Sequence, residues 1–303
     1  MPVIRIDTMG STLTTALDAA FDDQLVQSGP DAPAVILVHG FKYDPGNGGF
    51  DPHRFILSPT ALRDVPRSVS WPHHLGFTRP TGASKLCFTF GWPARGSIFA
   101  ARRNSRPASE ALSYLIRRIH AQSPTRPIHI MAHSLGARVA LRALNDVPIG
   151  AVSRVILMAA ALFQRETQAA MSTPAGRAVE VINVTSREND LYDLMLEGLF
   201  FQRTVGQGLA RPRPNWIDVQ IDNAATRSAL AAMGFPTRPP VARICHWSSY
   251  LRPGLFAFYR AALFKPEDMT LAKLREALPQ RSEPRLARLR DLDLPFRPKE
   301  PSS

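Results

Sequence analysis

A serine with small residues on both sides is the first feature of this sequence that could carry chemistry. The pentapeptide AHSLG at positions 132–136 follows the apolar run IHIMA and precedes a helical pattern at Leu135–Leu144. A strand, a sharp turn and a helix around a serine form a nucleophile elbow, which lifts the hydroxyl clear of a sheet. Ala132 stands where glycine is usual and is small enough for the turn. The alternative interpretation is that Ser134 only caps the following helix, a common use of serine.

A second feature, His39-Gly40-Phe41, precedes the elbow and ends the apolar run AVILV at 34–38. A serine nucleophile needs backbone N–H donors aimed at the oxyanion that develops on the substrate. One donor is the residue after the nucleophile, here Leu135, and the other comes from the loop after an earlier strand. Phe41 is the candidate for that second donor. The alternative is a plain turn in which Gly40 supplies a positive φ.

Three segments in this order, VHGF, FTFGWPARG and IHIMAHSLGARVALRAL, resemble the α/β-hydrolase superfamily. More narrowly, they are similar to a bacterial branch of predicted esterases and lipases of unknown function with Trp-Pro after the fourth strand, here Trp92-Pro93. The resemblance runs from about Ala34 to Leu263 and is most specific at the elbow. It implies an α/β-hydrolase fold and a Ser–acid–His triad in that chain order.

The resemblance assigns the remaining triad members by their position in the chain. Asp190 follows the run Val179–Val184 and is the expected acid, with Glu188 and Asp193 as alternatives. Asp190 could also serve as the N-cap of a helix beginning near Leu191. His246 is the one histidine after the acid and is the expected base. The resulting triad is Ser134, Asp190 and His246, with Phe41 and Leu135 as the oxyanion hole.

Short apolar runs alternate with helical patterns through the middle of the chain. Expected strands are Ala34–Val38, Leu86–Phe90, Ile128–Ala132, Val155–Met158, Val179–Val184 and Ile217–Ile221. Expected helices are Ala108–His120, Leu135–Leu144, Phe163–Ala170, Tyr192–Phe201 and Gly254–Leu263. Strands that are apolar at nearly every position are covered on both faces. The alternation predicts an α/β fold with a doubly wound, mostly parallel sheet and helices on both faces.

Composition divides the chain into three parts. Residues 1–30 are expected to be an N-terminal extension, 31–265 the hydrolase domain, and 266–303 a polar, Pro- and Arg-rich tail that is partly disordered. Two long connections, 41–85 and 191–215, are expected at the substrate side, where they could form a cap.

The chain has 303 residues, with 37 Lys and Arg against 25 Asp and Glu, and a formal charge of +12. This charge permits weak association with anionic membrane surfaces. The basic residues are dispersed, so no specific nucleic-acid partner is expected.

Metal and cofactor signatures are missing from the sequence. His73-His74 has no partner at metal-ligand spacing, so no metal site is expected. No P-loop or Rossmann glycine pattern occurs, so no cofactor is implied. Two cysteines exclude a disulfide scaffold, and the N-terminus lacks the apolar stretch of a signal peptide. A cytoplasmic location is therefore expected.

These features predict a serine hydrolase that cleaves a carboxylic ester, in the manner of an esterase or lipase, through an acyl-enzyme on Ser134. The expected substrate is a small-molecule or lipid ester. Alternatives are an acyltransferase or thioesterase with the same triad, or a catalytically inactive hydrolase fold that serves as a binding protein.

Overall fold

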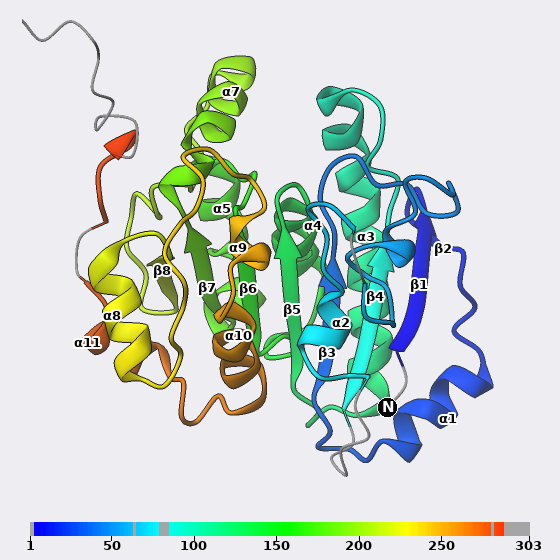
Figure 1. The fold of residues 1–303 in the computed structure, drawn as a ribbon. Coiled ribbons are helices and arrows are strands. Elements are labelled where there is room, and N and C mark those ends of the chain that lie inside the picture. The colour runs from blue at the N-terminus through cyan, green and yellow to red at the C-terminus, as the bar shows by residue number, and fades with distance from the viewer. Residues whose placement is uncertain (1–2, 63–64, 79–84, 280–281, 288–303) are drawn as a thin grey trace, which may run out of the picture.

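An eight-stranded sheet forms the centre of the computed structural model (Figure 1), which describes residues 3–62, 65–78, 85–279 and 282–287. The strands are β1 (Val3–Met9), β2 (Thr12–Leu13), β3 (Ala34–Val38), β4 (Leu86–Gly91), β5 (Ile128–His133), β6 (Arg154–Met158), β7 (Glu180–Thr185) and β8 (Trp216–Gln220). Their order is β2-β1-β4-β3-β5-β6-β7-β8, and only β2 runs antiparallel to its neighbour. The predicted doubly wound, mostly parallel sheet is confirmed.

Helices cover both faces of this sheet. The α-helices are α1 (Ala19–Gln27), α2 (Trp71–His74), α3 (Ile98–Gln122), α4 (Gly136–Ala143), α5 (Gln164–Ala170), α6 (Pro174–Ala178), α7 (Asp190–Phe200), α8 (Ala224–Ala232), α9 (Ser248–Leu251), α10 (Leu255–Phe264) and α11 (Leu271–Ala277). Short 3₁₀ helices are η1 (Pro52–Arg54), η2 (Leu144–Asp146) and η3 (Arg187–Asn189).

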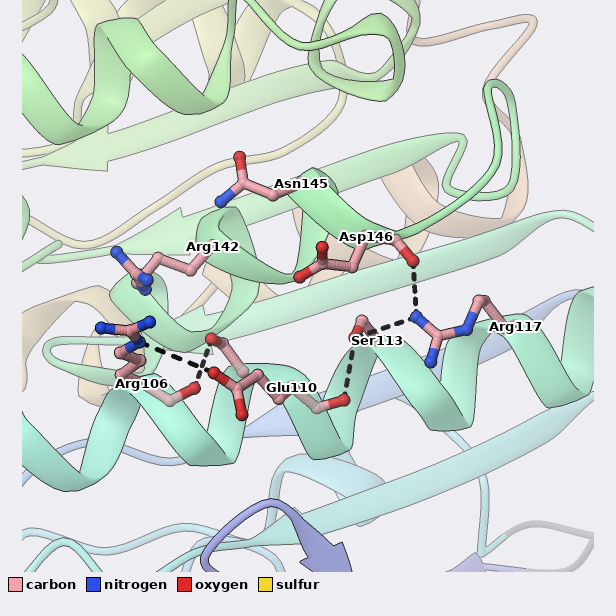
Figure 2. Close-up of a pocket in the computed structure, with 8 residues that line it drawn as sticks. Arg106, Glu110, Ser113, Arg117, Arg142, Asn145 and Asp146 are labelled. Carbon is pink, nitrogen blue, oxygen red and sulfur yellow. Dashed lines mark hydrogen bonds and ion pairs between the residues drawn. The ribbon is translucent and has the colours of Figure 1, made fainter.

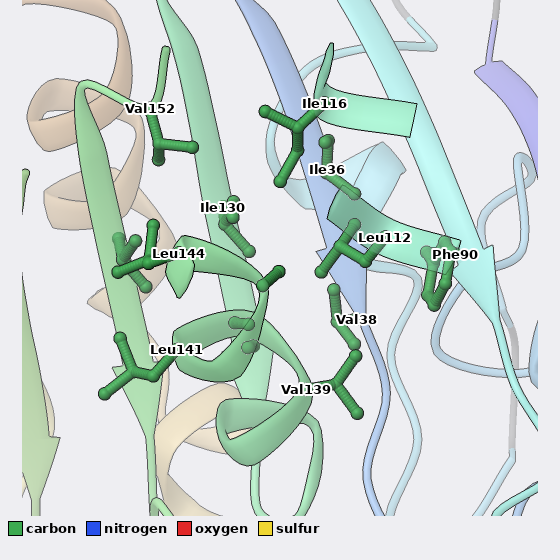
Figure 3. Close-up of a cluster of buried hydrophobic side chains, with 14 of the residues drawn as sticks. Ile36, Val38, Phe90, Leu112, Ile116, Ile130, Val139, Leu141, Leu144 and Val152 are labelled. Carbon is green, nitrogen blue, oxygen red and sulfur yellow. The ribbon is translucent and has the colours of Figure 1, made fainter. Parts of the chain in front are cut away.

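Two hydrophobic clusters lie on opposite faces of the sheet, because successive side chains of a strand point in opposite directions. Ile36 of β3 packs under α3 and α4 (Figure 3), whereas its neighbour Leu37 packs on the other face with α2 and α10. All five residues of β3 are buried, as are all six of β5. Continuous apolar runs therefore mark the central strands, as the sequence pattern predicts.

Both expected ends of the hydrolase domain need correction. Residues 3–9 are not an extension, because β1 pairs in parallel with β4 along its length and Ile6 is fully buried. Residues after 265 also belong to the fold, because α11 places Leu271 and Leu274 in the second hydrophobic cluster. The expected disordered end falls largely on residues 288–303, which lie outside the described residues.

The topology brings two loops together at one edge of the sheet. The chain leaves β3 toward β4 on one side and returns to β5 on the other, so the carboxyl ends of β3 and β5 are neighbours at a topological switch point. Ligands of doubly wound folds bind at such a point. Within the long connection 191–215, α7 projects beyond this carboxyl edge (Figure 1).

Candidate active site

Ser134 occupies a strained turn between β5 and α4. Its φ is +52°, in the left-handed region that non-glycine residues rarely adopt. The turn is held by a hydrogen bond of 2.9 Å from the Ser134 amide to the carbonyl oxygen of Met158. The N-cap of α4 is Leu135 and has no side-chain capping bond, so Ser134 is not the helix cap. Strain of this kind persists where the surrounding structure requires it and is common at functional sites.

Two glycines allow the loop after β3 to press against this turn. A Cβ on Gly136 would lie 2.3 Å from the carbonyl oxygen of His39, and a Cβ on Gly40 would lie 2.7 Å from Cβ of Ser134. Neither position accepts a side chain without movement of backbone or of the serine. Gly136, which the elbow pattern expects to be small, and Gly40 are thus both needed for the approach of the His39-Gly40-Phe41 loop to the elbow.

His246 lies directly beside Ser134 although 112 positions separate them in the chain. Its Nε2 atom is 2.9 Å from Oγ of Ser134. Its Nδ1 atom is 2.6 Å from the carbonyl oxygen Oδ1 of Asn189. The other end of this carboxamide donates from Nδ2 to Oδ2 of Asp193 at 3.1 Å, which is consistent with Oδ1 facing the imidazole. An amide oxygen only accepts, so Nδ1 carries the proton and Nε2 presents its lone pair to the hydroxyl.

The expected contact between Asp190 and His246 is not formed, and the prediction is corrected in favour of Asn189. Oδ2 of Asp190 accepts a hydrogen bond of 2.7 Å from the amide of Leu286, and Oδ1 lies 3.3 Å from the Arg187 guanidinium. Successive residues of a helical turn point about 100° apart, so neighbours in η3 and α7 face different partners. Asp190 is also not the N-cap of α7, which begins at this residue.

The two alternative acids lie close to the site but do not touch the imidazole in the part of the chain that the structure describes. Asp193 is one helical turn beyond Asn189 and reaches that amide instead. Glu188 forms a buried ion pair with Arg252 and accepts from the hydroxyl of Ser186. The backbone carbonyl of Glu188 also accepts from the amide of Cys245 at 2.8 Å. The loop that bears Asn189 is thereby joined to the loop that bears His246.

Two aromatic residues fix the position of His246. His133 is buried and donates from Nε2 to the backbone carbonyl of His246 at 3.1 Å. The Tyr192 ring stacks on the imidazole, with centroids 4.8 Å apart and planes at 29°. Sequence reasoning missed Tyr192 and Asn189, because the search for an acid passes over amides and because a tyrosine in an apolar helix carries no distinctive signal.

Burial sets the protonation of the groups around Ser134. It lowers the pKa of His246 well below the usual value, and neighbouring His133 lowers it further. Burial also lowers the pKa of His133 to about 4. The Asp193 carboxyl is raised by burial to a pKa of about 7, despite the hydrogen bond from Asn189. At neutral pH the imidazole of His246 is therefore a neutral base.

The predicted oxyanion amides belong to Phe41 and Leu135, the residues that follow Gly40 and Ser134, which approach each other closely. Within the described residues, the amides of Phe41 and Leu135 form no hydrogen bond with a protein group. The loop before Phe41 is rigid, because the buried ring of His39 stacks on Trp92, accepts from its amide at 3.0 Å and donates to the Gly40 carbonyl at 2.8 Å. Burial lowers the pKa of His39 to about 3, so this ring is a neutral support of the loop.

Comparison with known families agrees with this architecture. The family described as "Alpha/beta hydrolase of unknown function (DUF900)" matches residues 15–185, more than half of the chain. The chain belongs to this DUF900 family of α/β hydrolases. No curated protein matches the sequence.

Solved structures similar to this DUF900 chain share little sequence with it. An acetylxylan esterase is 14% identical, with 44% of this chain and 65% of that chain covered and a TM-score of 0.31. MenH from S. aureus is 13% identical over 82% of this chain and 97% of its own, with a TM-score of 0.34. The catalytic core of acetyl xylan esterase from Trichoderma reesei is 12% identical over 82% and 100%, with a TM-score of 0.33.

Hollows lined by the described residues include two on the surface of this DUF900 protein. One, of about 620 Å³, lies at the loops after β3 and β4 and is lined by Phe41, Lys42, Phe50, Arg95 and Gly96. The other, of about 540 Å³, lies between α3 and the α4–η2 segment (Figure 2).

Among the described residues, no group of three or more His, Cys, Asp and Glu side chains could hold a metal ion. No helix in the described ranges is long and apolar enough to span a membrane.

Proposed function

We propose that this protein is a serine hydrolase that cleaves a carboxylic ester through an acyl-enzyme on Ser134. The observation that carries the proposal is the hydrogen-bonded chain from Ser134 through His246 to Asn189, with distances of 2.9 and 2.6 Å. A nucleophile in contact with a base, and a base oriented by a third group, is the arrangement of nucleophilic catalysis. The DUF900 family and its α/β-hydrolase fold support this assignment.

The reaction begins with proton transfer from the Ser134 hydroxyl to Nε2 of His246. As the Oγ–carbon bond forms, the π electrons of the ester carbonyl move to its oxygen. The amides of Phe41 and Leu135 are the proposed donors to this oxyanion. His246 then gives its proton to the departing alkoxide as the ester bond breaks. Water repeats these steps on the acyl-enzyme and releases the carboxylic acid.

Asn189 orients the imidazole in this proposal, with Asp193 as its support. The Asn189 oxygen keeps the proton on Nδ1, which leaves Nε2 free to act as the base. Asp193 accepts from the same amide and so fixes which end of the carboxamide faces His246. Both an ionised and a protonated Asp193 can accept this hydrogen bond. The Tyr192 ring beneath the imidazole stabilises the imidazolium cation that forms during each proton transfer.

A fluorophosphonate probe tests the proposal, because it labels serines that a neighbouring base activates. We expect one adduct, located on Ser134 by mass spectrometry, and turnover of p-nitrophenyl esters by the unlabelled protein. The Ser134→Ala variant loses both, whereas Ser97→Ala, which alters the N-cap of α3, keeps both. Folded protein with neither label nor ester turnover contradicts the proposal and favours the inactive binding protein.

A further inference from the structure

One wall residue of the hollow of about 620 Å³ directly follows Gly40 in the chain, and Gly40 approaches Ser134 closely. Gly40 packs against Ser134, and the next residue, Phe41, forms part of the hollow wall. Consecutive Cα atoms are about 3.8 Å apart. The space of about 620 Å³ is therefore close enough to Ser134 along the chain to be considered as a site for a remote part of the substrate.

Hydrogen bonds hold the two cationic residues of the hollow in neighbouring segments. The amide of Lys42 donates to the carbonyl of Ala94 at 2.9 Å, and the amide of Ala94 donates to the carbonyl of Tyr43 at 2.9 Å. The loop after β3 is thus joined to the loop after β4, which bears Arg95. Lys42 has a φ of +79°, a left-handed conformation that is unfavourable for lysine and that these bonds maintain.

The Arg95 guanidinium is positioned by an aromatic ring. Its central carbon lies 3.6 Å from the centroid of Phe50. A guanidinium stacked on a ring keeps its N–H groups at the periphery of the plane, where they can form two parallel bonds to a carboxylate or a phosphate. The loop that presents Phe50 is itself closed by hydrogen bonds between Phe50 and both Asp44 and Asn47.

Neither cation is neutralised by a neighbouring acid. In the part of the chain that the structure describes, Lys42 and Arg95 form no ion pair with a carboxylate. The acids nearest in sequence have other partners: Asp44 accepts from the side chain of Asn47, and Asp51 from Arg5 and the amide of His53. The described residues that line the hollow therefore include two positive charges and two phenylalanines and no negative group.

The hollow between α3 and α4 is different, although it is also rich in arginine (Figure 2). Glu110 and Asp146 contribute carboxylates to its wall. Arg106 is paired with Glu110, and Arg117 donates to the Asp146 carbonyl at 2.6 Å. The carboxylates largely compensate the positive charges of this hollow, so we expect it to bind an anion less strongly.

We propose that the hollow lined by Lys42, Phe50 and Arg95 binds an anionic group of the substrate, a carboxylate or a phosphate several bonds from the scissile ester. This inference rests on the proposed ester hydrolysis and adds the substrate class: esters that carry a negative charge. Lys42 supplies a point charge, and Arg95 supplies the paired donors that recognise the planar or tetrahedral oxyanion.

The test compares kcat/KM for three esters that share one leaving group: mono-p-nitrophenyl glutarate, p-nitrophenyl 4-phosphonobutyrate and neutral p-nitrophenyl pentanoate. Wild-type protein is expected to favour a charged ester over the neutral one. In Lys42→Met/Arg95→Met that preference falls about tenfold or more, as expected for the loss of a hydrogen bond to a charged group. The charged ester that loses more identifies the group that binds.

The control variant is Arg103→Met, which removes one exposed positive charge from α3 outside the hollow and is expected to keep the preference. An unchanged preference in the double variant, or an equal loss for charged and neutral esters, overturns the anionic subsite. If Ser134 is still labelled and the neutral ester is still cleaved, either of these results leaves the proposed ester hydrolysis intact. Failure of wild-type protein to label or to cleave any ester contradicts the proposed function itself.

Discussion

The carbonyl oxygen of Asn189 lies 2.6 Å from Nδ1 of His246 and accepts the hydrogen bond that a carboxylate commonly accepts from this atom. A carboxamide orients the ring and fixes its tautomer, as a carboxylate does. It provides less electrostatic stabilisation of the imidazolium, because it has no net charge. The stacked ring of Tyr192 offsets part of this loss.

Replacement of Asn189 separates its role from that of Asp190. Asn189→Ala leaves the imidazole without its orienting acceptor, and we expect kcat to fall about 10²-fold, within the usual range for general acid–base catalysis. Asp190→Asn keeps an oxygen for the Leu286 amide, and kcat is expected to remain within a few-fold of wild type. Steady-state kinetics on one activated ester, with circular dichroism to verify folding, decides between them. A large loss of kcat in folded Asp190→Asn, with little loss of kcat in Asn189→Ala, would mean that Asp190 is the triad acid, as the sequence predicts.

The buried carboxyl of Asp193 makes stability depend on pH. Its pKa is about 7 in the folded protein and 3.8 when unperturbed. Because the pKa of Asp193 is higher in the folded protein than in the unfolded chain, the contribution of this carboxyl to stability is most favourable below about pH 4. As pH rises to 7, the unfolded chain ionises first and stability falls. Asp193→Asn keeps an acceptor for Asn189 and lacks this ionisation.

Urea unfolding of both proteins at pH 5 and pH 8 measures this effect. From pH 5 to pH 8, we expect the unfolding free energy of Asp193→Asn to increase relative to that of the wild type by on the order of a few kcal/mol. A difference that is the same at both pH values means that Asp193 ionises freely in the folded protein.

The pH profile of kcat/KM reports the protonation of His246. Burial and His133 hold its pKa well below 6.5, so it stays neutral and basic in mildly acidic solution. We expect the acidic limb of the profile to lie well below pH 6.5 and activity at pH 6.5 to remain close to its plateau. An acidic limb centred at or above pH 6.5 would show that the folded protein does not depress this pKa.

Gly136 is expected to tolerate no side chain. A Cβ there would lie 2.3 Å from the His39 carbonyl, so Gly136→Ala must push the loop that bears Phe41 away from the elbow. We expect a loss of about 1–3 kcal/mol in unfolding free energy, as for other overpacked sites, together with a loss of activity. The control is Gly198→Ala on α7, where a Cβ meets nothing within 4 Å and where alanine favours the helix. Equal unfolding free energies of the two variants would mean that the His39-Gly40-Phe41 loop moves at little cost to accommodate the new Cβ.

The sequence predicts the central fold well because its strands are buried on both faces. The expected strand Ala34–Val38 has the observed bounds. Of the other five expected strands, three differ from the observed bounds by one residue at one end and two by one residue at both ends. The edge strand β1 was missed because only two of its seven residues are buried, which leaves no continuous apolar run. Helix α11 was missed because it is short and only two of its seven residues are buried.

In the candidate site, the sequence correctly predicts the contact between Ser134 and His246 but not the residue that orients His246. Ser134 and His246 are found together because the elbow pattern and the chain order restrict them to one choice each. The orienting group depends on which residue of a tight turn faces inward, and this is set by the 3₁₀ geometry of Arg187–Asn189, which composition does not reveal. The roles of Phe41 and Leu135 stay predictions.

The long separation of the site residues in the chain also has a kinetic consequence. Asn189 and His246 are 57 positions apart, and Ser134 and His246 are 112 apart. Contacts between such distant residues require large loops to close and form late in folding. Helix content should therefore recover before probe labelling after dilution from denaturant, and catalytic competence would mark the last stage of renaturation.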